Sequence, residues 1–419
     1  MKRSVLPSSV EGIVKAPASK SMMIRAVAAA TLADGVSTLR NPSDCRDAIA
    51  AIEISKSIGA KVDSQDELVK IEGTGGKIRL VNDIINCKES GLCIRLFTPV
   101  ISLGDKETLV TGEGSLLRRP VGMMKEALRR MGVDFEDNEG KLPIRLKGPL
   151  RAGKVNVDGS TSSQFVSGLL FALPLVDGKS EIEVINLKSK PYIDMTLSAL
   201  SDFGVNVKND GYRVFYVEGT QEYKAQEYYV EGDWSGASFL LVAGAIAGRV
   251  RVTGLKVDSL QADRAVINVL HMAGAVVKEG KNYVEASYGT LRGFDFDATE
   301  CPDLFPPLVA LASCCKGRSK IKGVHRLVYK ESNRAEALLE EFRKMGVRLS
   351  VENDYIVVDG EGQPEGGRVS SHNDHRIAMA CAVAGLASKD GVVISGAEAV
   401  EKSYPTFFED IKKLGAKVR

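Results

Sequence analysis

The sequence predicts an α/β (α+β) protein with six copies of one strand–helix–strand–helix–strand–strand repeat, arranged as two domains of three repeats. Three observations support this prediction. Six helix-like runs end in similar Gly-containing segments at intervals of 69 to 73 residues, six polar clusters recur at a similar spacing, and the chain has 419 residues. A chain of this length is too long for a single hydrophobic core and suggests two or three domains.

Six glycines mark the end of one helix in each repeat. They are Gly59, Gly132, Gly204, Gly274, Gly346 and Gly415. Each follows an apolar residue or Ala and precedes Ala or Val, and a strand-favouring residue comes two positions later. Because Gly adopts a positive φ at no steric cost, each segment predicts a helix that ends and leads into a strand. Four residues earlier, five of the six helices carry Leu, Phe or Ile, the spacing of a buried helical face, whereas the first carries Ser55.

Polar clusters mark the start of the other helix in each repeat. They are centred near residues 20, 90, 163, 233, 303 and 375, and an apolar run follows each of them. Ser, Asp and Asn are typical N-caps, because their side-chain oxygens accept hydrogen bonds from the first turn of a helix. Among the helices that end in the six glycines, Asn333 with Glu336 predicts a capping box, which places Lys330 and Glu331 in the preceding loop.

Strands are expected where short β-branched runs lie between these helices, for example at 182–185, 250–253, 356–358 and 391–394. The domain junctions are expected beside the Ser19 cluster and the 231–233 segment. One domain would then contain residues 1–18 plus 232–419, and the second residues 19–231. This division assigns the N-terminal strand to the C-terminal half.

Composition excludes several classes of function. The formal net charge of +2, with 26% charged residues, gives no global reason to expect nucleic-acid or membrane binding. Seven Cys without a C-x-x-C pair predict reduced, mostly buried thiols, and four His without H-E-x-x-H predict no metal site. No apolar run approaches about 18 residues, and no signal-like apolar region follows the N-terminus, so we expect a cytoplasmic protein.

Basic residues recur at or near the predicted helix starts. They are Lys20, Arg25, Arg119, Lys330, Arg334, Arg376 and Lys402. Taken singly, each could be an ordinary solvated side chain. Together, in a chain close to neutrality, they favour a substrate or pair of substrates with several negative charges, because helix N-termini also attract anions.

Two acids stand among these bases. Asp303 lies at one predicted helix start, and Glu331 lies beside Lys330. A carboxylate among cations is usually a salt-bridge partner, and this interpretation applies to either residue alone. As a pair facing one substrate, the two carboxyl groups could instead serve as general base and general acid.

Taken together, these clusters resemble the enolpyruvyl transferase family, in its 5-enolpyruvylshikimate-3-phosphate synthase branch. The matching segments, in the family's order, are 17–21 with Arg25, 89–91 with Arg95, Arg119-Pro120, 162–164, 189–194, 231–233, Asp303, 330–334, 374–376, and Lys402 before Pro405. The resemblance implies an inverse α/β fold of two domains, each of three βαβαββ repeats with inward-directed helices. It also implies an active site in the cleft between them.

The resemblance further implies an enzyme that transfers the enolpyruvyl group of phosphoenolpyruvate to the 5-hydroxyl of shikimate-3-phosphate. The residues it places at shikimate-3-phosphate are Lys20, Ser21, Arg25, Ser162, Ser163, Gln164, Ser189, Asp303 and Lys330. Those it places at phosphoenolpyruvate are Lys20, Gly91, Arg119, Gln164, Arg334, Arg376 and Lys402. Asp303 would be the base, and Glu331, helped by Lys20, would protonate the methylene carbon. No cofactor, metal or macromolecular partner is implied, and the family suggests a monomer.

Two rival functions remain as alternatives. The sister enzyme, UDP-N-acetylglucosamine enolpyruvyl transferase, carries a Cys five residues before the Arg-Pro, where this chain has Gly114. A non-catalytic repeat scaffold that binds anions would need the cations but not both acids. Within the family pattern, the sequence departs at Leu92, where many members have Thr, and at Arg326, where better-known members have Asn.

Overall fold

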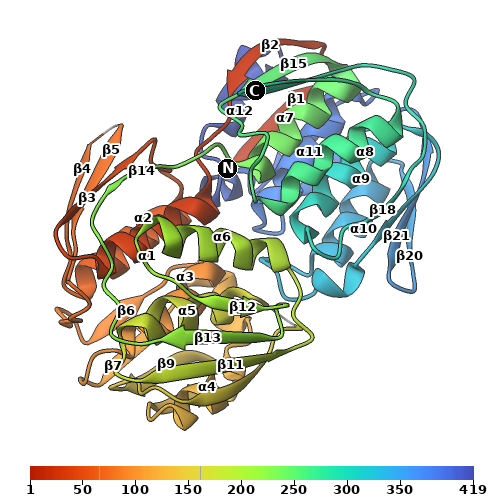
Figure 1. Ribbon diagram of the computed structural model, residues 1–419. Coiled ribbons are helices and arrows are strands. Elements are labelled where there is room, and N and C mark those ends of the chain that lie inside the picture. The colour runs from red at the N-terminus through yellow and green to blue at the C-terminus, as the bar shows by residue number, and fades with distance from the viewer. Residues whose placement is uncertain (66, 161) are drawn as a thin grey trace. The chain divides into compact units, whose positions relative to one another are not determined.

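The computed structural model describes residues 1–65, 67–160 and 162–419 (Figure 1). The chain divides into two compact units. The terminal unit contains Met1–Ser19 and Glu231–Arg419, and the middle unit contains Lys20–Val230. Each unit is described by itself below.

The described residues form six four-stranded sheets with one shared pairing pattern. In the sheet β10-β11-β13-β12, for example, β10 is parallel to β11, β11 is antiparallel to β13, and β13 is antiparallel to β12. Helices connect the first strand to the second and the second to the third. This is the predicted βαβαββ repeat.

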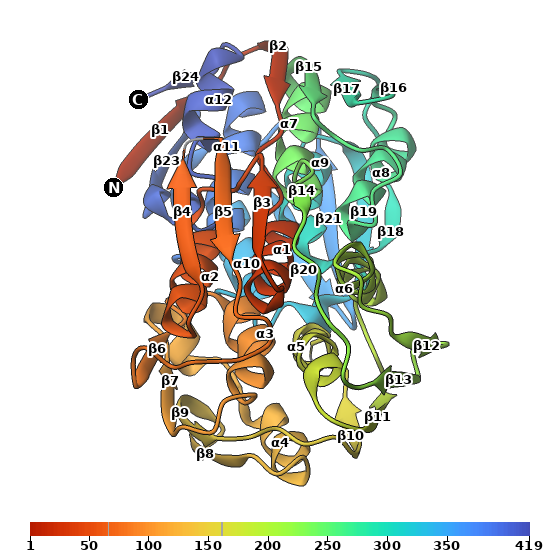
Figure 2. The same ribbon diagram turned by 60° about the vertical axis from the view of Figure 1, so that its left-hand side comes forward.

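The middle unit contains three of these repeats. The first has α1 (Lys20–Leu32), β3 (Val36–Arg40), α2 (Arg46–Ser57), β4 (Lys61–Gln65), β5 (Leu68–Glu72) and β14 (Glu227–Tyr229). The second has β6 (Ile84–Asn86), α3 (Gly91–Ile101), β7 (Thr108–Thr111), η1 (Gly114–Arg118), η2 (Gly122–Met124), α4 (Lys125–Arg130), β8 (Asp134–Asn138) and β9 (Lys141–Lys147). The third has β10 (Lys154–Asp158), α5 (Gln164–Ala172), η3 (Leu173–Leu175), β11 (Lys179–Ile185), α6 (Lys190–Asp202), β12 (Lys208–Asp210) and β13 (Val214–Glu218). Figure 2 shows β4, β5 and β3 side by side in the first of these sheets.

The terminal unit contains the other three repeats. The fourth has β2 (Val10–Lys15), α7 (Trp234–Ala247), β15 (Gly248–Thr253), η4 (Ala262–Ala265), α8 (Val266–Ala273), β16 (Val276–Gly280) and β17 (Tyr283–Ser287). The fifth has β18 (Asp295–Asp297), η5 (Pro302–Leu304), α9 (Phe305–Ser313), β19 (Lys316–Lys322), η6 (Val324–Arg326), α10 (Arg334–Lys344), β20 (Arg348–Glu352) and β21 (Tyr355–Glu361). The sixth has β22 (Gly367–Ser370), α11 (His375–Ala387), β23 (Val392–Ser395), η7 (Ala397–Lys402), α12 (Phe407–Lys413), β24 (Lys417–Val418) and β1 (Lys2–Leu6).

The N-terminal strands pair with the C-terminal half, as predicted. β1 lies between β23 and β24 and is antiparallel to both, with Val5 opposite Val392 and Val418. β2 is parallel to β15 along its whole length. Both ends of the chain therefore belong to the same unit.

The first helix of each repeat is buried inside its unit. In the terminal unit α7, α9 and α11 pack against one another, and in the middle unit α3 packs against α1 and α5. These helices are apolar on nearly all sides; in α11, for instance, every residue from His375 to Leu386 is buried. A helix that is hydrophobic all round is expected in a core rather than on a surface.

The six predicted glycines all adopt a positive φ, between 77° and 108°. The apolar residues four positions before five of them are fully buried, which confirms the predicted helical face. The exception, Ser55, is buried as well. Its hydroxyl donates to the Ala51 carbonyl and accepts from Thr31 Oγ1 at 2.7 Å, so the polar group is satisfied inside the core.

All seven cysteines are buried and free of disulfide bonds. Burial raises the pKa of Cys45 to about 11, and thiols with a raised pKa are poor nucleophiles at neutral pH. In the described part of the chain, no helix combines the length and the apolar character that crossing a membrane requires.

Candidate active site

Polar residues cap several of the buried helices, as the sequence predicts. The Ser90 hydroxyl accepts from Cys93 N at the start of α3, and Asp233 accepts from Gly236 N at the start of α7. At the start of α11, Asp374 Oδ1 accepts from Arg376 N at 2.9 Å. The caps fix where each helix begins, and they place the residues beside them at the helix mouths.

In the polar cluster before α5, the hydroxyl of Ser162 accepts from Gln164 N, whereas the side chain of Ser163 makes no capping bond. The predicted capping box at the start of α10 is wrong. Asn333 precedes α10, yet its side chain does not cap the helix, so the capping box with Glu336 does not form. Arg334 N donates to the carbonyl of Leu327, so the loop backbone satisfies this N–H. Lys330 and Glu331 nevertheless lie in the loop before α10, as predicted.

In the middle unit, α1 carries two of the predicted cations. Lys20, its first residue, forms an ion pair with Asp47 of α2 at 3.0 Å, and both side chains are about one-tenth exposed. Arg25, one turn further on, is 1% exposed. Its guanidinium donates to Thr196 Oγ1 at 2.9 Å and to the carbonyls of Ser21 and Tyr192. Burial lowers the pKa of Arg25 to about 10.

Arg95 of α3 contacts two predicted phosphoenolpyruvate residues, Gly91 and Gln164. It donates to Gln164 Oε1 at 3.0 Å and to the carbonyls of Gly91 and Pro120. The guanidinium of Arg119 lies against Gly91, where an added Cβ would sit 2.6 Å from Arg119 Cζ. Only Gly allows this approach. The sequence analysis assigned Arg95 to a family segment but gave it no role. Its hydrogen-bond partner Gln164 lies 69 residues away, so no local pattern reveals this contact.

The remaining predicted serines of this unit lie at helix starts or in the loops before them. Ser21 is in the first turn of α1, Ser162 and Ser163 precede α5, and Ser189 precedes α6 with a left-handed backbone, φ 60°. Ser163 and Ser189 are buried. Leu92, one of the two departures from the family pattern, is also buried, in the first turn of α3.

In the terminal unit, Asp303 of η5 accepts from three cations. Its Oδ1 accepts from Lys330 Nζ at 3.3 Å and from Arg334 Nη1 at 2.8 Å, and its Oδ2 accepts from Arg376 Nη2 at 3.0 Å. The Asp303 side chain is 18% exposed, so solvent or a ligand can reach it. Burial lowers the pKa of Lys330 below its ordinary value, although the charge of Asp303 opposes this shift. Arg326, the second residue at which the sequence departs from the family pattern, also lowers the pKa of Lys330.

Arg334 joins the two predicted catalytic acids. Its guanidinium is fully buried and contacts Asp303, Glu331 at 2.5 Å and Asp374 at 3.0 Å. Burial alone lowers the pKa of Arg334, but the carboxylates of Asp374, Glu331 and Asp303 outweigh it and raise that pKa above its ordinary value. Asp303 and Glu331 are thus salt-bridge partners of one arginine.

Asp374 and Lys402 complete this cluster. Asp374 is fully buried and also accepts from the Ser332 hydroxyl at 3.1 Å, which ties the loop before α10 to the start of α11. Lys402 Nζ donates to the carbonyl of Asn373 at 2.6 Å. Lys402 is the last residue of η7, five positions before α12, so it lies further from a helix start than predicted.

Among the described residues, one group of side chains has the spacing to hold a metal ion: Glu340, Glu341 and His372. Lys344 Nζ donates to both carboxylates, at 2.7 and 2.9 Å. His372 Nε2 lies 2.5 Å from Glu341 Oε1. Lys344 and the His372 ring therefore already occupy oxygens of these acids, and the group forms an ion-pair network beside the loop before α11.

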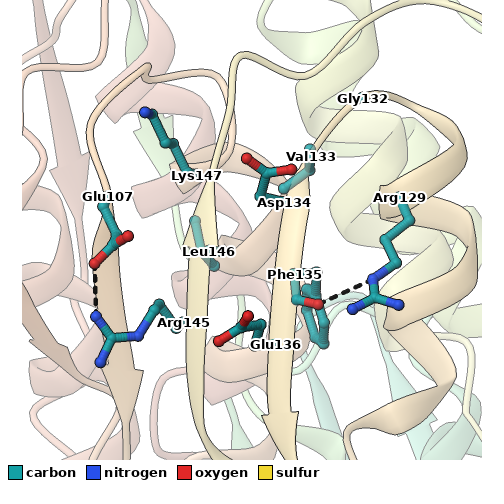
Figure 3. A pocket seen from close by; sticks show the side chains of 10 residues that line it. All are labelled: Glu107, Arg129, Gly132, Val133, Asp134, Phe135, Glu136, Arg145, Leu146 and Lys147. Carbon is teal, nitrogen blue, oxygen red and sulfur yellow. Dashed lines mark hydrogen bonds and ion pairs between the residues drawn. The ribbon is translucent and has the colours of Figure 1, made fainter.

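A hollow of about 490 Å³ on the middle unit, shown in Figure 3, contains none of the predicted site residues. Its lining comes from the end of α4 and from β8 and β9, with Glu107 in addition. Arg145 pairs with Glu107 at 2.6 Å, and Arg129 donates to the Phe135 carbonyl. The lining also carries the charged residues Asp134, Glu136 and Lys147, so the hollow is a polar surface feature of this repeat that includes no predicted site residue.

Gly114 bears on the sister-enzyme alternative. It has a φ of 52°, and an added Cβ would collide with the carboxylate of Glu89. Glu89 Oε1 accepts from Ser115 N at 3.0 Å. A cysteine at position 114 would have to displace Glu89 from this contact. The conformation of the loop therefore favours Gly at this position.

Comparisons with known proteins identify the family to which the chain is similar. The family model described as EPSP synthase (3-phosphoshikimate 1-carboxyvinyltransferase) matches residues 6–411. The 3-phosphoshikimate 1-carboxyvinyltransferase of Clostridium novyi is 36% identical, over 98% of this chain and 97% of the relative. That of Clostridium kluyveri is 38% identical, over 99% and 97%.

Solved structures give the same result for the fold. An EPSP synthase from Acinetobacter baumannii has a TM-score of 0.84 at 25% identity, and the match covers 100% of this chain and 99% of that one. The enolpyruvyl transferase NikO from Streptomyces tendae has a TM-score of 0.81 at 19% identity, covering 100% and 98%. The predicted fold class is confirmed.

Proposed function

Since the chain belongs to the EPSP synthase family, we propose which of its residues perform the family's reaction. The enzyme is a transferase of the shikimate pathway. It moves the enolpyruvyl group of phosphoenolpyruvate to the 5-hydroxyl of shikimate-3-phosphate and releases phosphate. The roles below are supported by the two clusters of charged residues, one in each unit.

Shikimate-3-phosphate is bound mainly by the middle unit. Its proposed contacts are Lys20, Ser21, Arg25, Ser162, Ser163, Gln164, Ser189, Asp303 and Lys330. The hydroxyl and amide groups suit the hydroxyls of the ring, and the cations suit the phosphate. The burial of Arg25 supports its role, because a buried guanidinium held by neutral acceptors keeps its positive charge available to an anion.

Phosphoenolpyruvate is bound by Lys20, Gly91, Arg119, Gln164, Arg334, Arg376 and Lys402. The close approach of Arg119 to Gly91 supports this set, as does the bond between Arg95 and Gln164. Two polyanions repel each other, so several cations are needed to hold them together. Both substrate sets draw residues from both units, so the reaction needs the whole chain.

The chemistry is an addition followed by an elimination. Asp303 takes the proton of the 5-hydroxyl, whose oxygen attacks C2 of phosphoenolpyruvate, while Glu331, helped by Lys20, gives a proton to the methylene carbon. The tetrahedral intermediate then loses a proton from the methyl group and expels phosphate, which restores the double bond. These roles use no metal ion and no organic cofactor.

The convergence of Asp303 and Glu331 on Arg334 is the observation that carries this proposal. In the structure, cations that would bind phosphoenolpyruvate are paired with these acids. An arriving anion competes for Arg334 and Arg376, and a carboxylate that loses a cation partner becomes a better proton acceptor. Substrate binding would thereby prepare the base for its task.

The test is release of inorganic phosphate from phosphoenolpyruvate, measured with shikimate-3-phosphate or with UDP-N-acetylglucosamine as second substrate. We expect phosphate only with shikimate-3-phosphate, and none from phosphoenolpyruvate alone. Release only with the UDP-sugar would establish the sister activity, and no release would favour an anion-binding scaffold. We also propose that the enzyme works as a monomer in the cytoplasm; a light-scattering mass of two chains would contradict the first point.

A further inference from the structure

Two buried hydroxyl groups of the middle unit have no part in the proposed mechanism. Thr196 lies on α6 and Ser167 on α5, both are 0% exposed, and their hydroxyl oxygens are 2.8 Å apart. Arg25 of α1 reaches the same point, since its Nε donates to Thr196 Oγ1 at 2.9 Å. Because α6 packs against both α1 and α5, one polar contact joins three helices inside the unit (Figure 1).

The direction of each hydrogen bond at Thr196 follows from the capacity of a hydroxyl, which has one proton and two lone pairs. The Tyr192 carbonyl, 3.0 Å from Thr196 Oγ1, can only accept, so the proton of Thr196 is donated to it. The two lone pairs accept from Arg25 Nε and from Ser167, which is therefore the donor in its contact. Every hydrogen-bonding position of Thr196 is thus used, and the orientation of its hydroxyl is fixed.

Arg25 keeps donors that no described residue uses. A guanidinium carries five N–H groups. Three of them donate: Nε to Thr196, Nη1 to the Ser21 carbonyl at 2.9 Å, and Nη2 to the Tyr192 carbonyl at 3.0 Å. One N–H of Nη1 and one of Nη2 therefore have no acceptor among the described residues. Such a pair of donors suits two oxygens of a phosphate or carboxylate group.

We propose that Thr196 is a positioning residue for shikimate-3-phosphate, whose hydroxyl holds the Arg25 guanidinium so that its two remaining N–H groups meet the phosphate of the substrate. Ser167 acts through Thr196, by donating to it. This inference rests on the proposed function, because it takes Arg25 as a contact of shikimate-3-phosphate. Neither hydroxyl group touches the substrate.

The physical reason is preorganisation. An arginine side chain has many rotamers, and a side chain that becomes ordered only when the ligand arrives weakens binding. The bonds to Nε, Nη1 and Nη2 fix the guanidinium of Arg25 in its plane before any ligand binds. Without the Thr196 hydroxyl, the buried Nε loses its acceptor, and the guanidinium turns toward another one. A purely structural role for Thr196 would lower stability and leave the affinity for the substrate unchanged.

The experiment measures the Kd of shikimate-3-phosphate alone by isothermal titration calorimetry, so it needs no turnover. Thr196→Val keeps the shape but has no hydroxyl, and its Kd should rise about tenfold, the loss of one charge-assisted hydrogen bond at the binding arginine. Thr196→Ser keeps the hydroxyl and should restore the wild-type Kd. In steady-state kinetics, Thr196→Val should raise KM for shikimate-3-phosphate, with little change in kcat.

Ser167→Ala tests the order of the chain of hydrogen bonds. It removes the donor to Thr196 and should raise the Kd less, about threefold, because the bond to Arg25 remains. In a chain that already carries Thr196→Val, the same change should raise the Kd no further, since Ser167 acts only through the Thr196 hydroxyl. Effects that multiply in the double variant would contradict this order.

Thr31→Val is the matched control. Thr31 is also fully buried, on the same helix as Arg25, and its hydroxyl oxygen lies 2.7 Å from both the Val27 carbonyl and the Ser55 hydroxyl. In urea unfolding this variant should lose about as much stability as Thr196→Val, but its Kd for shikimate-3-phosphate should equal that of the wild type.

A wild-type Kd in Thr196→Val, or an equal rise in Thr31→Val, would overturn the role of Thr196. If Thr196→Val does not fold, Ser167→Ala decides, and an unchanged Kd in that variant would overturn the role as well. A wild type that does not bind shikimate-3-phosphate would instead overturn the proposed function, so the two failures can be told apart.

Discussion

The two units hold their buried arginines in opposite ways. Arg25 of the middle unit donates to a hydroxyl and two carbonyls, and none of these acceptors carries a charge. Arg334 of the terminal unit contacts three carboxylates. Burial therefore lowers the pKa of Arg25, whereas the neighbouring acids raise the pKa of Arg334.

This difference separates binding from proton transfer. A cation held by neutral groups keeps its charge for a ligand, so the middle unit is suited to attract phosphate and carboxylate groups. When acids surround a cation, they compensate its charge before any ligand arrives. Its main role is then to orient those acids. We expect substitutions at the compensated charges of the terminal unit to affect kcat or folding, and those at uncompensated charges to affect KM.

Asp303→Asn should have the largest effect on catalysis. The amide cannot accept a proton, so kcat should fall by about 10²- to 10⁴-fold, the usual contribution of a general base. KM for both substrates should change much less. The matched control is Asp47→Asn, which removes the acid paired with Lys20 in the middle unit. Steady-state kinetics that show equal losses of kcat in the two variants would break the proposed division between the units.

Arg334→Met should have the largest effect on folding. Removing one member of a buried ion network leaves Asp374, which is fully buried, without its main counter-charge, at a cost of about 3–5 kcal/mol. Arg25→Met removes hydrogen bonds to neutral partners and should cost about 1–3 kcal/mol. Urea unfolding of both variants measures the two free energies. An Arg25 variant as unstable as the Arg334 variant would show that charge compensation does not distinguish the sites.

The sequence predicts the repeat well because the ends of its helices depend on residues close together in the chain. The glycines that end helices, such as Gly274 and Gly346, need only a positive φ, and this requirement is visible in a single segment. The Asn333 side chain makes no capping bond, and the Leu327 carbonyl of the preceding loop accepts from Arg334 N. Whether a polar residue before a helix caps it depends on the fold of that loop, which a short motif does not reveal.

The site was predictable only in part, for the same reason. Motif spacing identified Asp303, Glu331 and Arg334 but not that one guanidinium would join both acids. Nor did any local pattern mark Asp263 of η4, whose burial and raised pKa arise only in the folded chain. Ion-pair partners many residues apart are a property of tertiary structure.

Lys402→Ala tests what decides whether a substitution changes KM or kcat: the unit to which the cation belongs, or the presence of an acidic partner beside it. Lys402 belongs to the terminal unit, but it donates to a neutral carbonyl, that of Asn373. If compensation is what matters, the variant should raise KM for phosphoenolpyruvate about tenfold, the loss of one charged hydrogen bond, with little change in kcat. Initial rates at varied phosphoenolpyruvate measure this. A change confined to kcat, or to KM for shikimate-3-phosphate, would contradict the placement of Lys402.

The last expected effect is a pH-dependent gain in stability for Asp263→Asn. The native pKa of Asp263 is raised from 3.8 to about 7, so between these values the folded chain binds more protons than the unfolded chain. Stability from this group is therefore present at low pH and is lost as pH rises from about 4 to 7. Asn has no such loss, so the stability of the variant relative to the wild type should increase between pH 5 and pH 8 in urea unfolding. Ser235→Ala should make the pH dependence steeper than in the wild type, because it removes the hydroxyl that donates to Asp263 and favours the ionised form. If the relative stability of Asp263→Asn does not change with pH, Asp263 is ionised throughout the range. The terminal unit would then balance its cations with one more fixed negative charge.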